Sequence, residues 1–110
     1  MTVKEMADVC GFKVLNEGNN TAVVTEPYCC DLLSIAMGNA PSGCAWCTVM
    51  SNKNTLAVTT LTDAACIILC CDVAVDESLI EKAAEEDIPL FATDKPVFDA
   101  ALSIYNAINA

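Results

Sequence analysis

The chain has no histidine and no arginine among its 110 residues. Without histidine it lacks the side chain that most often serves as a general base near neutral pH. Without arginine it lacks the bidentate donor that clamps carboxylates and phosphates. A self-sufficient enzyme is therefore the least favoured function class. Any bound anion must be held by backbone N–H groups, helix N-termini or a lysine.

Positive charge is scarce throughout the sequence. Five lysines stand against fifteen acidic residues, which gives a net charge of −10. Nucleic acids are bound mainly through Lys and Arg that neutralise phosphates, so we expect no nucleic-acid partner. No stretch approaches the roughly 20 apolar residues that span a bilayer, and residues 1–5 lack the apolar core of a signal peptide. We therefore expect a cytoplasmic protein with no membrane partner.

Aromatic side chains are also few. They make up 5% of the sequence, whereas apolar residues make up 55%, so the core must consist mainly of Ala, Val, Leu, Ile and Cys. Small apolar side chains suit the close packing of helices on a sheet, which favours the α/β class. The length is that of one common domain, and no linker or repeat divides the chain. We expect a single α/β domain over residues 1–110.

Capping residues and apolar periodicity predict the order of helices and strands. Thr2 and Glu5 have capping-box spacing at the start of a helix, and Asp31 is predicted to cap a second one. From residue 45 onward strands and helices alternate, which is typical of two βαβ units. We expect a mostly parallel sheet of about four to five strands flanked by helices. The predicted helices are 3–10, 32–37, 54–61, 77–86 and 96–108, and the predicted strands are 12–15, 21–25, 45–50, 64–71 and 89–92, the first two joined as a hairpin.

Eight cysteines give the sequence its most unusual chemistry. In a reducing compartment they are structural thiols that pack as small hydrophobic residues. Cys44 and Cys47 form a C-x-x-C motif, but the motif enters a predicted strand, where residues three apart point to opposite faces. Structural thiols are therefore the favoured interpretation. The alternatives are a zinc or iron–sulfur site built from Cys29, Cys30, Cys44 and Cys47, or redox-sensing chemistry of the cysteines.

Four stretches of the chain carry a resemblance to a known family, and together they span most of its length. They are residues 28–37, 41–46, 64–69 and 88–93. Here the sequence resembles the DRTGG-domain family, which is related to the N-terminal domain of HPr kinase/phosphorylase. The resemblance implies a fold like that N-terminal domain, and it places the family's Asp-Arg pair near residues 51–54 and its Thr-Gly-Gly at residues 70–72. This chain has Asn52-Lys53 and Cys70-Cys71-Asp72 there instead.

Ligands of parallel α/β sheets bind beyond the carboxyl ends of the strands. In this chain that edge offers helix N-termini, lysines and small polar groups, which suit a small anion or a nucleotide. The predicted ligand-binding residues are Ser51, Asn52, Lys53, Asn54, Cys70, Cys71, Asp72 and Thr93.

Taken together, these features predict a non-catalytic regulatory or ligand-binding module with no cofactor and no catalytic residue. We expect it to act through a partner protein and to form a homodimer, because two-fold dimers are the commonest oligomers. The alternative function is that of a cysteine-based metal, iron–sulfur or redox-sensing protein.

Overall fold

One five-stranded sheet with helices on both faces makes up the computed structural model, which describes residues 1–110. The helices are α1 (Val3–Cys10), α2 (Leu33–Asn39), α3 (Lys53–Thr62), α4 (Glu77–Glu85) and α5 (Val97–Ile108), and the strands are β1 (Lys13–Asn16), β2 (Pro27–Cys29), β3 (Ala45–Thr48), β4 (Cys66–Leu69) and β5 (Leu90–Ala92). None of these helices combines the length and the apolar character that crossing a bilayer requires.

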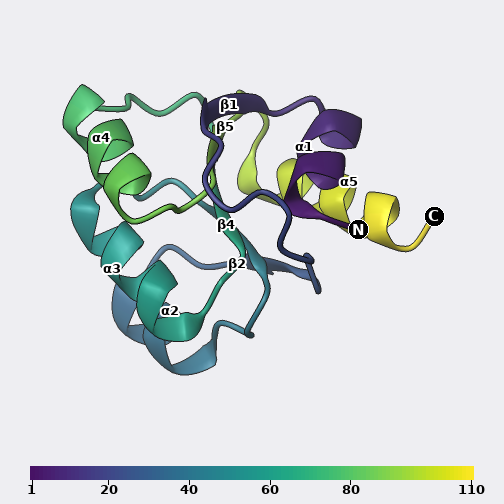
Figure 1. The fold of residues 1–110 in the computed structure, drawn as a ribbon. Coiled ribbons are helices and arrows are strands. Elements are labelled where there is room, and N and C mark those ends of the chain that lie inside the picture. The colour runs from purple at the N-terminus through teal and green to yellow at the C-terminus, as the bar shows by residue number, and fades with distance from the viewer.

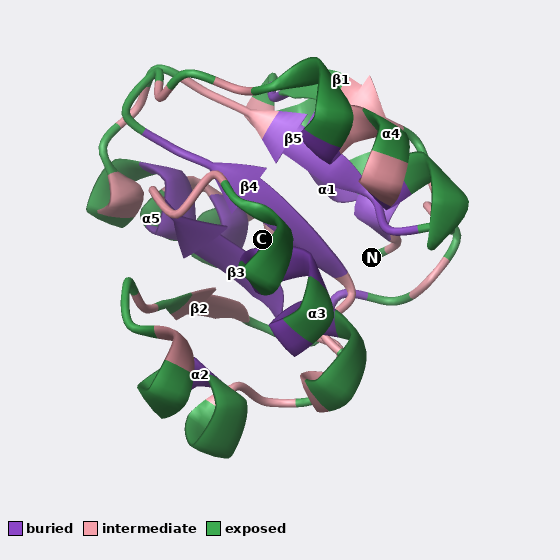
Figure 2. Cartoon of the chain, turned by 90° about the vertical axis from the view of Figure 1, so that its left-hand side faces the viewer, coloured by how far each residue is buried: buried purple, intermediate pink, exposed green.

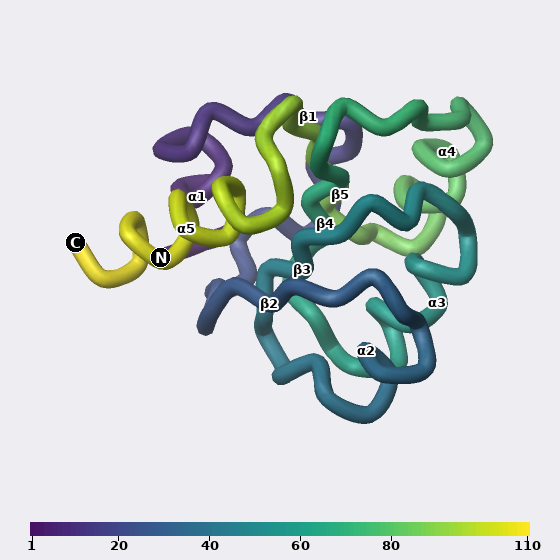
Figure 3. Tube along the Cα trace, turned by 180° about the vertical axis from the view of Figure 1, so that it is seen from behind, coloured from purple at the N-terminus to yellow at the C-terminus, as the bar shows by residue number.

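The strands lie in the order β1-β5-β4-β3-β2. β2, β3, β4 and β5 are parallel, and β1 joins β5 in the antiparallel sense. Helices α2, α3 and α4 cover one face of the sheet, and α1 and α5 cover the other (Figure 1). Both chain ends lie on the α1 and α5 side, as the view from behind also shows (Figure 3). The predicted α/β class and mostly parallel sheet are confirmed.

The central strands β3 and β4 are buried at every position (Figure 2). Their side chains alternate between the two faces, as the pleat of a strand requires. Small residues dominate the face under α1 and α5, where the close helices leave little room. That face carries Ala45, Cys47, Cys66 and Ile68, and the face under α2, α3 and α4 carries Trp46, Ile67 and Leu69.

The predicted hairpin is wrong. Residues 21–25 form no strand and make only one isolated bridge, between Thr2 and Val23. β1 lies at one edge of the sheet and β2 at the other, so the chain between them must cross the whole sheet. It crosses at the amino ends of the parallel strands, held by backbone hydrogen bonds from Asn19 to Asp87 and from Thr25 to Gly43. The polar run after β1 therefore begins a long crossing, not a tight turn.

Asp31 also has a different task from the predicted one. The N-cap of α2 is Leu32, and no side chain caps that helix. The Oδ1 atom of Asp31 instead accepts hydrogen bonds from Thr48 Oγ1 at 2.8 Å and from the Val49 N–H at 2.9 Å. Because β2 runs parallel to β3 with Cys29 opposite Cys47, the residues just after β2 reach the end of β3.

Gly18 in the crossing segment gives a test of this fold. Its φ is +50°, and an added Cβ would lie 2.5 Å from the Pro89 nitrogen. Gly18→Ala should therefore lower the free energy of unfolding by about 2 kcal/mol or more. Gly38 in α2 has open space around it, so Gly38→Ala should raise that free energy by up to about 1 kcal/mol. Urea denaturation measures both, and equal effects of the two changes would contradict the crossing.

Candidate functional site

The connections after β3, β4 and β5 meet at the carboxyl edge of the sheet, as predicted. The Cys70 N–H binds the Thr48 carbonyl at 2.9 Å, and the Cys71 N–H binds the Lys95 carbonyl at 2.9 Å. The Asp72 N–H binds the Thr93 carbonyl at 3.1 Å. The structure thus brings the predicted segments together, but these backbone donors are already engaged within the fold. They cannot cradle an anion without rearrangement.

The N-terminus of α3 is likewise satisfied from within. Asn52 is its N-cap, and the Asn52 Oδ1 atom accepts hydrogen bonds from the Asn54 N–H at 3.0 Å and the Thr55 N–H at 3.3 Å. Lys53 is exposed and belongs to neither of the two ion pairs in the structure. The hydroxyl oxygen of Ser51 is buried and has no hydrogen-bond partner. Lys53 is therefore the one predicted residue that presents a free positive charge to solvent, and the exposed Asp72 presents a negative one.

The backbone at the position of the family's glycines is unusual. Cys71 and Asp72 have φ values of +62° and +53°, the left-handed conformation that costs a side chain about 1–2 kcal/mol and that glycine adopts freely. The chain therefore keeps, at the two positions where the resemblance places Gly-Gly, a backbone shape that glycine favours. No sequence pattern would predict this shape from a Cys-Asp pair.

The largest cleft lies at the opposite edge of the sheet. It has a volume of about 390 Å³ and is lined by residues at the amino ends of β3, β4 and β5 and by the crossing segment. Asp63 and Asp87 both line it, without any lysine, and Ser42 Oγ donates a hydrogen bond to Asp63 Oδ2 at 2.7 Å. Sequence reasoning missed this cleft because it predicted a hairpin where the chain crosses. None of the three clefts in the structure includes any of the eight predicted ligand-binding residues.

The cysteines proposed as metal ligands do not form one site. The sheet separates them: Cys47 packs under α1 and α5, whereas Cys44 and Cys30 pack on the opposite face. No three His, Cys, Asp or Glu side chains are placed to hold a metal ion. The structure therefore does not bring Cys29, Cys30, Cys44 and Cys47 together as one zinc or iron–sulfur site, because residues three apart across a strand point to opposite faces.

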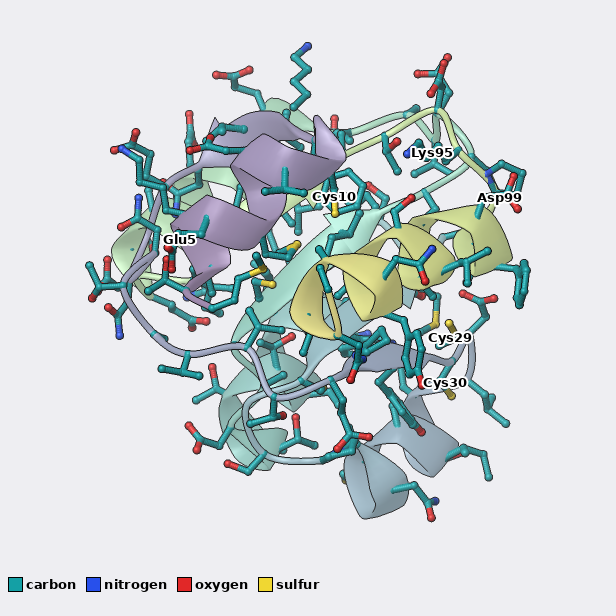
Figure 4. The ribbon with its side chains drawn as sticks, turned by 90° about the vertical axis from the view of Figure 1, so that its right-hand side faces the viewer. Glu5, Cys10, Cys29, Cys30, Lys95 and Asp99 are labelled. Atoms are coloured by element: carbon teal, nitrogen blue, oxygen red, sulfur yellow. The ribbon has the colours of Figure 1, made fainter.

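A different set of thiols does come together. Cys29 on β2 lies directly opposite Cys47 on β3, and Cys47 and Cys70 pack in the same buried cluster under α1 and α5. Figure 4 shows Cys29 at the end of β2, beside α5. Cys29 is exposed, whereas Cys47 and Cys70 are fully buried. We call Cys29, Cys47 and Cys70 the thiol row.

Hydrogen bonding gives the three thiols of the thiol row different pKa values. The hydrogen bond from Cys47 lowers the pKa of Cys29 from 9.0 to about 7, against burial and the nearby Asp31 carboxylate, which both raise it. The same kind of bond lowers the pKa of Cys70. The pKa of Cys47 is raised, because its proton is held by its two thiol neighbours and its site is buried. By contrast, burial raises the pKa of Cys44 to about 12.

Comparison with known proteins addresses the fold. No protein-family model matches the chain, and no curated protein does. A crystal structure of the CBS and DRTGG domains of the regulatory region of Clostridium perfringens pyrophosphatase, complexed with the activator diadenosine tetraphosphate, superimposes with a TM-score of 0.77. The fold is DRTGG-like. The two sequences are 12% identical, and the similarity covers 96% of this chain but 46% of the other. The chain thus spans about half the length of that regulatory region.

The acidity of Cys29 leads to a prediction about pH. Only the thiolate attacks an alkylating reagent, so the alkylation rate of Cys29 should rise with pH and reach half its maximum near pH 7, the value its pKa sets. In Cys47→Ala the donor is absent, and the midpoint should move up toward 9.0, the ordinary value. Iodoacetamide labelling at a series of pH values, read by peptide mass spectrometry, measures both midpoints. A midpoint that Cys47→Ala leaves unchanged would contradict the hydrogen bond as the cause.

Proposed function

We propose that the chain is a non-catalytic regulatory domain that binds a nucleotide or a similar small anion and acts through a partner protein. One observation carries the proposal: nearly the whole chain shares the fold of about half of a regulatory region, with CBS and DRTGG domains, that was crystallised with a dinucleotide activator. The absence of histidine and arginine agrees with a regulatory role, because the chain lacks the usual base and the guanidinium clamp.

The carboxyl edge of the sheet carries an acidic residue too, Asp72, but it is the edge with a lysine and an uncapped helix N-terminus, so we place the anion there. The larger cleft at the amino edge carries Asp63 and Asp87, which repel a phosphate. The carboxyl edge carries the exposed Lys53, and no side chain caps the N-terminus of α5 there. A helix N-terminus attracts anions through its free N–H groups and its dipole. Because the donors of Cys71 and Asp72 are engaged, binding at this edge requires their connections to shift.

A nucleotide titration tests this proposal. Diadenosine tetraphosphate and ATP should each raise the thermal midpoint of the chain, since a ligand that binds only the folded state stabilises it by mass action. Lys53→Ala should weaken binding by about tenfold, the loss of one charge-assisted hydrogen bond. Lys4→Ala is the matched control, because Lys4 is equally exposed but lies on α1. Isothermal titration calorimetry gives the affinities.

Two results would count against the nucleotide proposal. One is the absence of any thermal shift with either nucleotide. The other is an equal loss of affinity in Lys53→Ala and Lys4→Ala, which would indicate unspecific attraction to positive charge and not a site at the carboxyl edge.

We also propose that two copies of the chain associate through α5. Phe98, Leu102 and Tyr105 are spaced four and three residues apart, so they lie on one side of the helix, and all three are exposed. An exposed apolar stripe on a helix is the kind of surface that dimers bury. At a net charge of −10 two copies repel each other, so salt should strengthen their association.

Sedimentation equilibrium tests the dimer. We expect a mass of about twice 11.6 kDa at micromolar concentration, and Phe98→Ser should weaken association by about tenfold or more. Leu61 on α3 is the matched control: it is 71% exposed and Phe98 is 70% exposed, so Leu61→Ser should leave the mass unchanged. A monomer at every concentration, in low and high salt, would contradict the proposal.

A further inference from the structure

The thiol row places an exposed cysteine directly opposite a buried one. Cys29 and Cys47 are partners in the register of β2 and β3. Neighbouring strands lie about 4.8 Å apart, which is within the Cα separation of roughly 4.4–6.8 Å that disulfides span. Both side chains project from the same face of the sheet, because residues directly opposite each other in a sheet do so. The backbone geometry therefore permits a bond between the two sulfurs.

Access to the thiol row comes from one side only. Cys29 is exposed on the outer strand, whereas Cys47 and Cys70 are fully covered. A reagent from solvent therefore meets Cys29 first, and Cys47 lies behind it as its register partner on the neighbouring strand. Redox-sensing cysteines are solvent-accessible and often lie next to a resolving cysteine, and this arrangement fits that description.

We propose that Cys29 and Cys47 form a redox-sensitive site that hydroperoxides oxidise to a disulfide between β2 and β3. Cys29 is the attacking thiol and Cys47 the resolving thiol. The site is independent of nucleotide binding and needs no metal ion.

The chemistry balances in two steps. The Cys29 thiolate attacks one oxygen of the hydroperoxide, the O–O bond breaks, and an alcohol leaves while Cys29 becomes a sulfenic acid. The Cys47 sulfur then attacks the Cys29 sulfur, the S–O bond breaks, and hydroxide leaves with the Cys47 proton as water. Two thiols are oxidised by two electrons in all, and one hydroperoxide is reduced to alcohol and water.

The surroundings of Cys29 favour the first step. The Cys47 hydrogen bond stabilises the Cys29 thiolate, so about half of Cys29 is ionised near pH 7. Asp31 and Cys70 are the other titratable groups near this pair, and the Asp31 carboxylate opposes ionisation of both Cys29 and Cys70. The buried Cys47 keeps its proton until Cys29 has been oxidised, which suits a resolving thiol.

The other cysteines do not offer such a pair. Cys30 follows Cys29 in the chain but packs toward the opposite face, where its carbonyl accepts a hydrogen bond from Trp46 Nε1 at 3.0 Å. Cys71 is exposed but lies past the end of β4, so it has no cysteine as its register partner in the sheet. These two residues are therefore suitable internal controls.

Peptide mapping of the oxidised chain tests the proposal. The reduced full chain is treated with hydrogen peroxide, remaining thiols are blocked with iodoacetamide, and the protein is cleaved before aspartates. Cleavage before Asp31 separates Cys29 from Cys47, so a disulfide between them joins two peptides. We expect fragmentation spectra that place the bond at Cys29 and Cys47, and dithiothreitol should release the two peptides.

Variants make the assignment specific. Cys29→Ser alters an exposed position, and it should abolish the crosslinked peptide pair. Cys30→Ser should leave the yield of that pair within about twofold, because the sulfur of Cys30 lies on the other face. Intact mass under non-reducing conditions should show a single chain two hydrogens lighter.

Three outcomes would overturn the proposal. The first is a crosslink that survives in Cys29→Ser. The second is oxidation of Cys29 in the wild type to sulfinic acid without any crosslink to Cys47. The third is a bond that joins two chains instead of two strands of one chain. None of these readouts depends on the Cys47 variant, which alters a buried residue.

Discussion

Burial of β3 and β4 on both faces is the constraint on which the rest of the molecule depends. Every position of these two strands is covered, so each face needs its own layer of helices. The pleat then assigns successive residues to opposite layers. Small residues such as Ala45 and Cys47 go to the α1 and α5 side, and Trp46 goes to the other. With few aromatic residues available, a core built in this way has to fill its space with thiols and methyl groups.

The same alternation accounts for the chemistry of the cysteines. Cys44 directly precedes β3 and Cys47 lies three residues on, within that strand, so the sheet stands between the two side chains. Because Cys29 and Cys47 are partners across strands, they share a face and meet. Sequence spacing points to the pair Cys44 and Cys47, whereas strand register places Cys29 beside Cys47. The proposed reactivity of Cys29 therefore depends on strand register.

Sequence patterns predicted most of the fold and less of the site. Most helices could be predicted because capping acts locally: Thr2 and Glu5 form the predicted capping box at the start of α1. Strand 64–71 could be predicted from the sequence because a parallel strand covered on both faces is a continuous apolar run. β2 could not be predicted from the sequence: it has three residues beginning with Pro27, and it is a strand only because β3 lies beside it. The thiol row depends on the pairing of β2 with β3, so it could not be predicted from the sequence either.

The carboxyl edge shows how a fold can keep its shape while its chemistry changes. Cys71 and Asp72 hold a left-handed backbone at a cost that glycine would avoid. The N–H groups of these residues bind carbonyls of the β5–α5 connection, so the strained turn joins two loops at this edge. The strain is therefore offset by backbone contacts between the loops, and those contacts do not depend on the side chains. Side chains there are free to differ from glycine, and Cys70, the first residue of the triplet, points inward to the thiol row. One short turn thus links the edge where a ligand is proposed to bind with the buried thiols behind it.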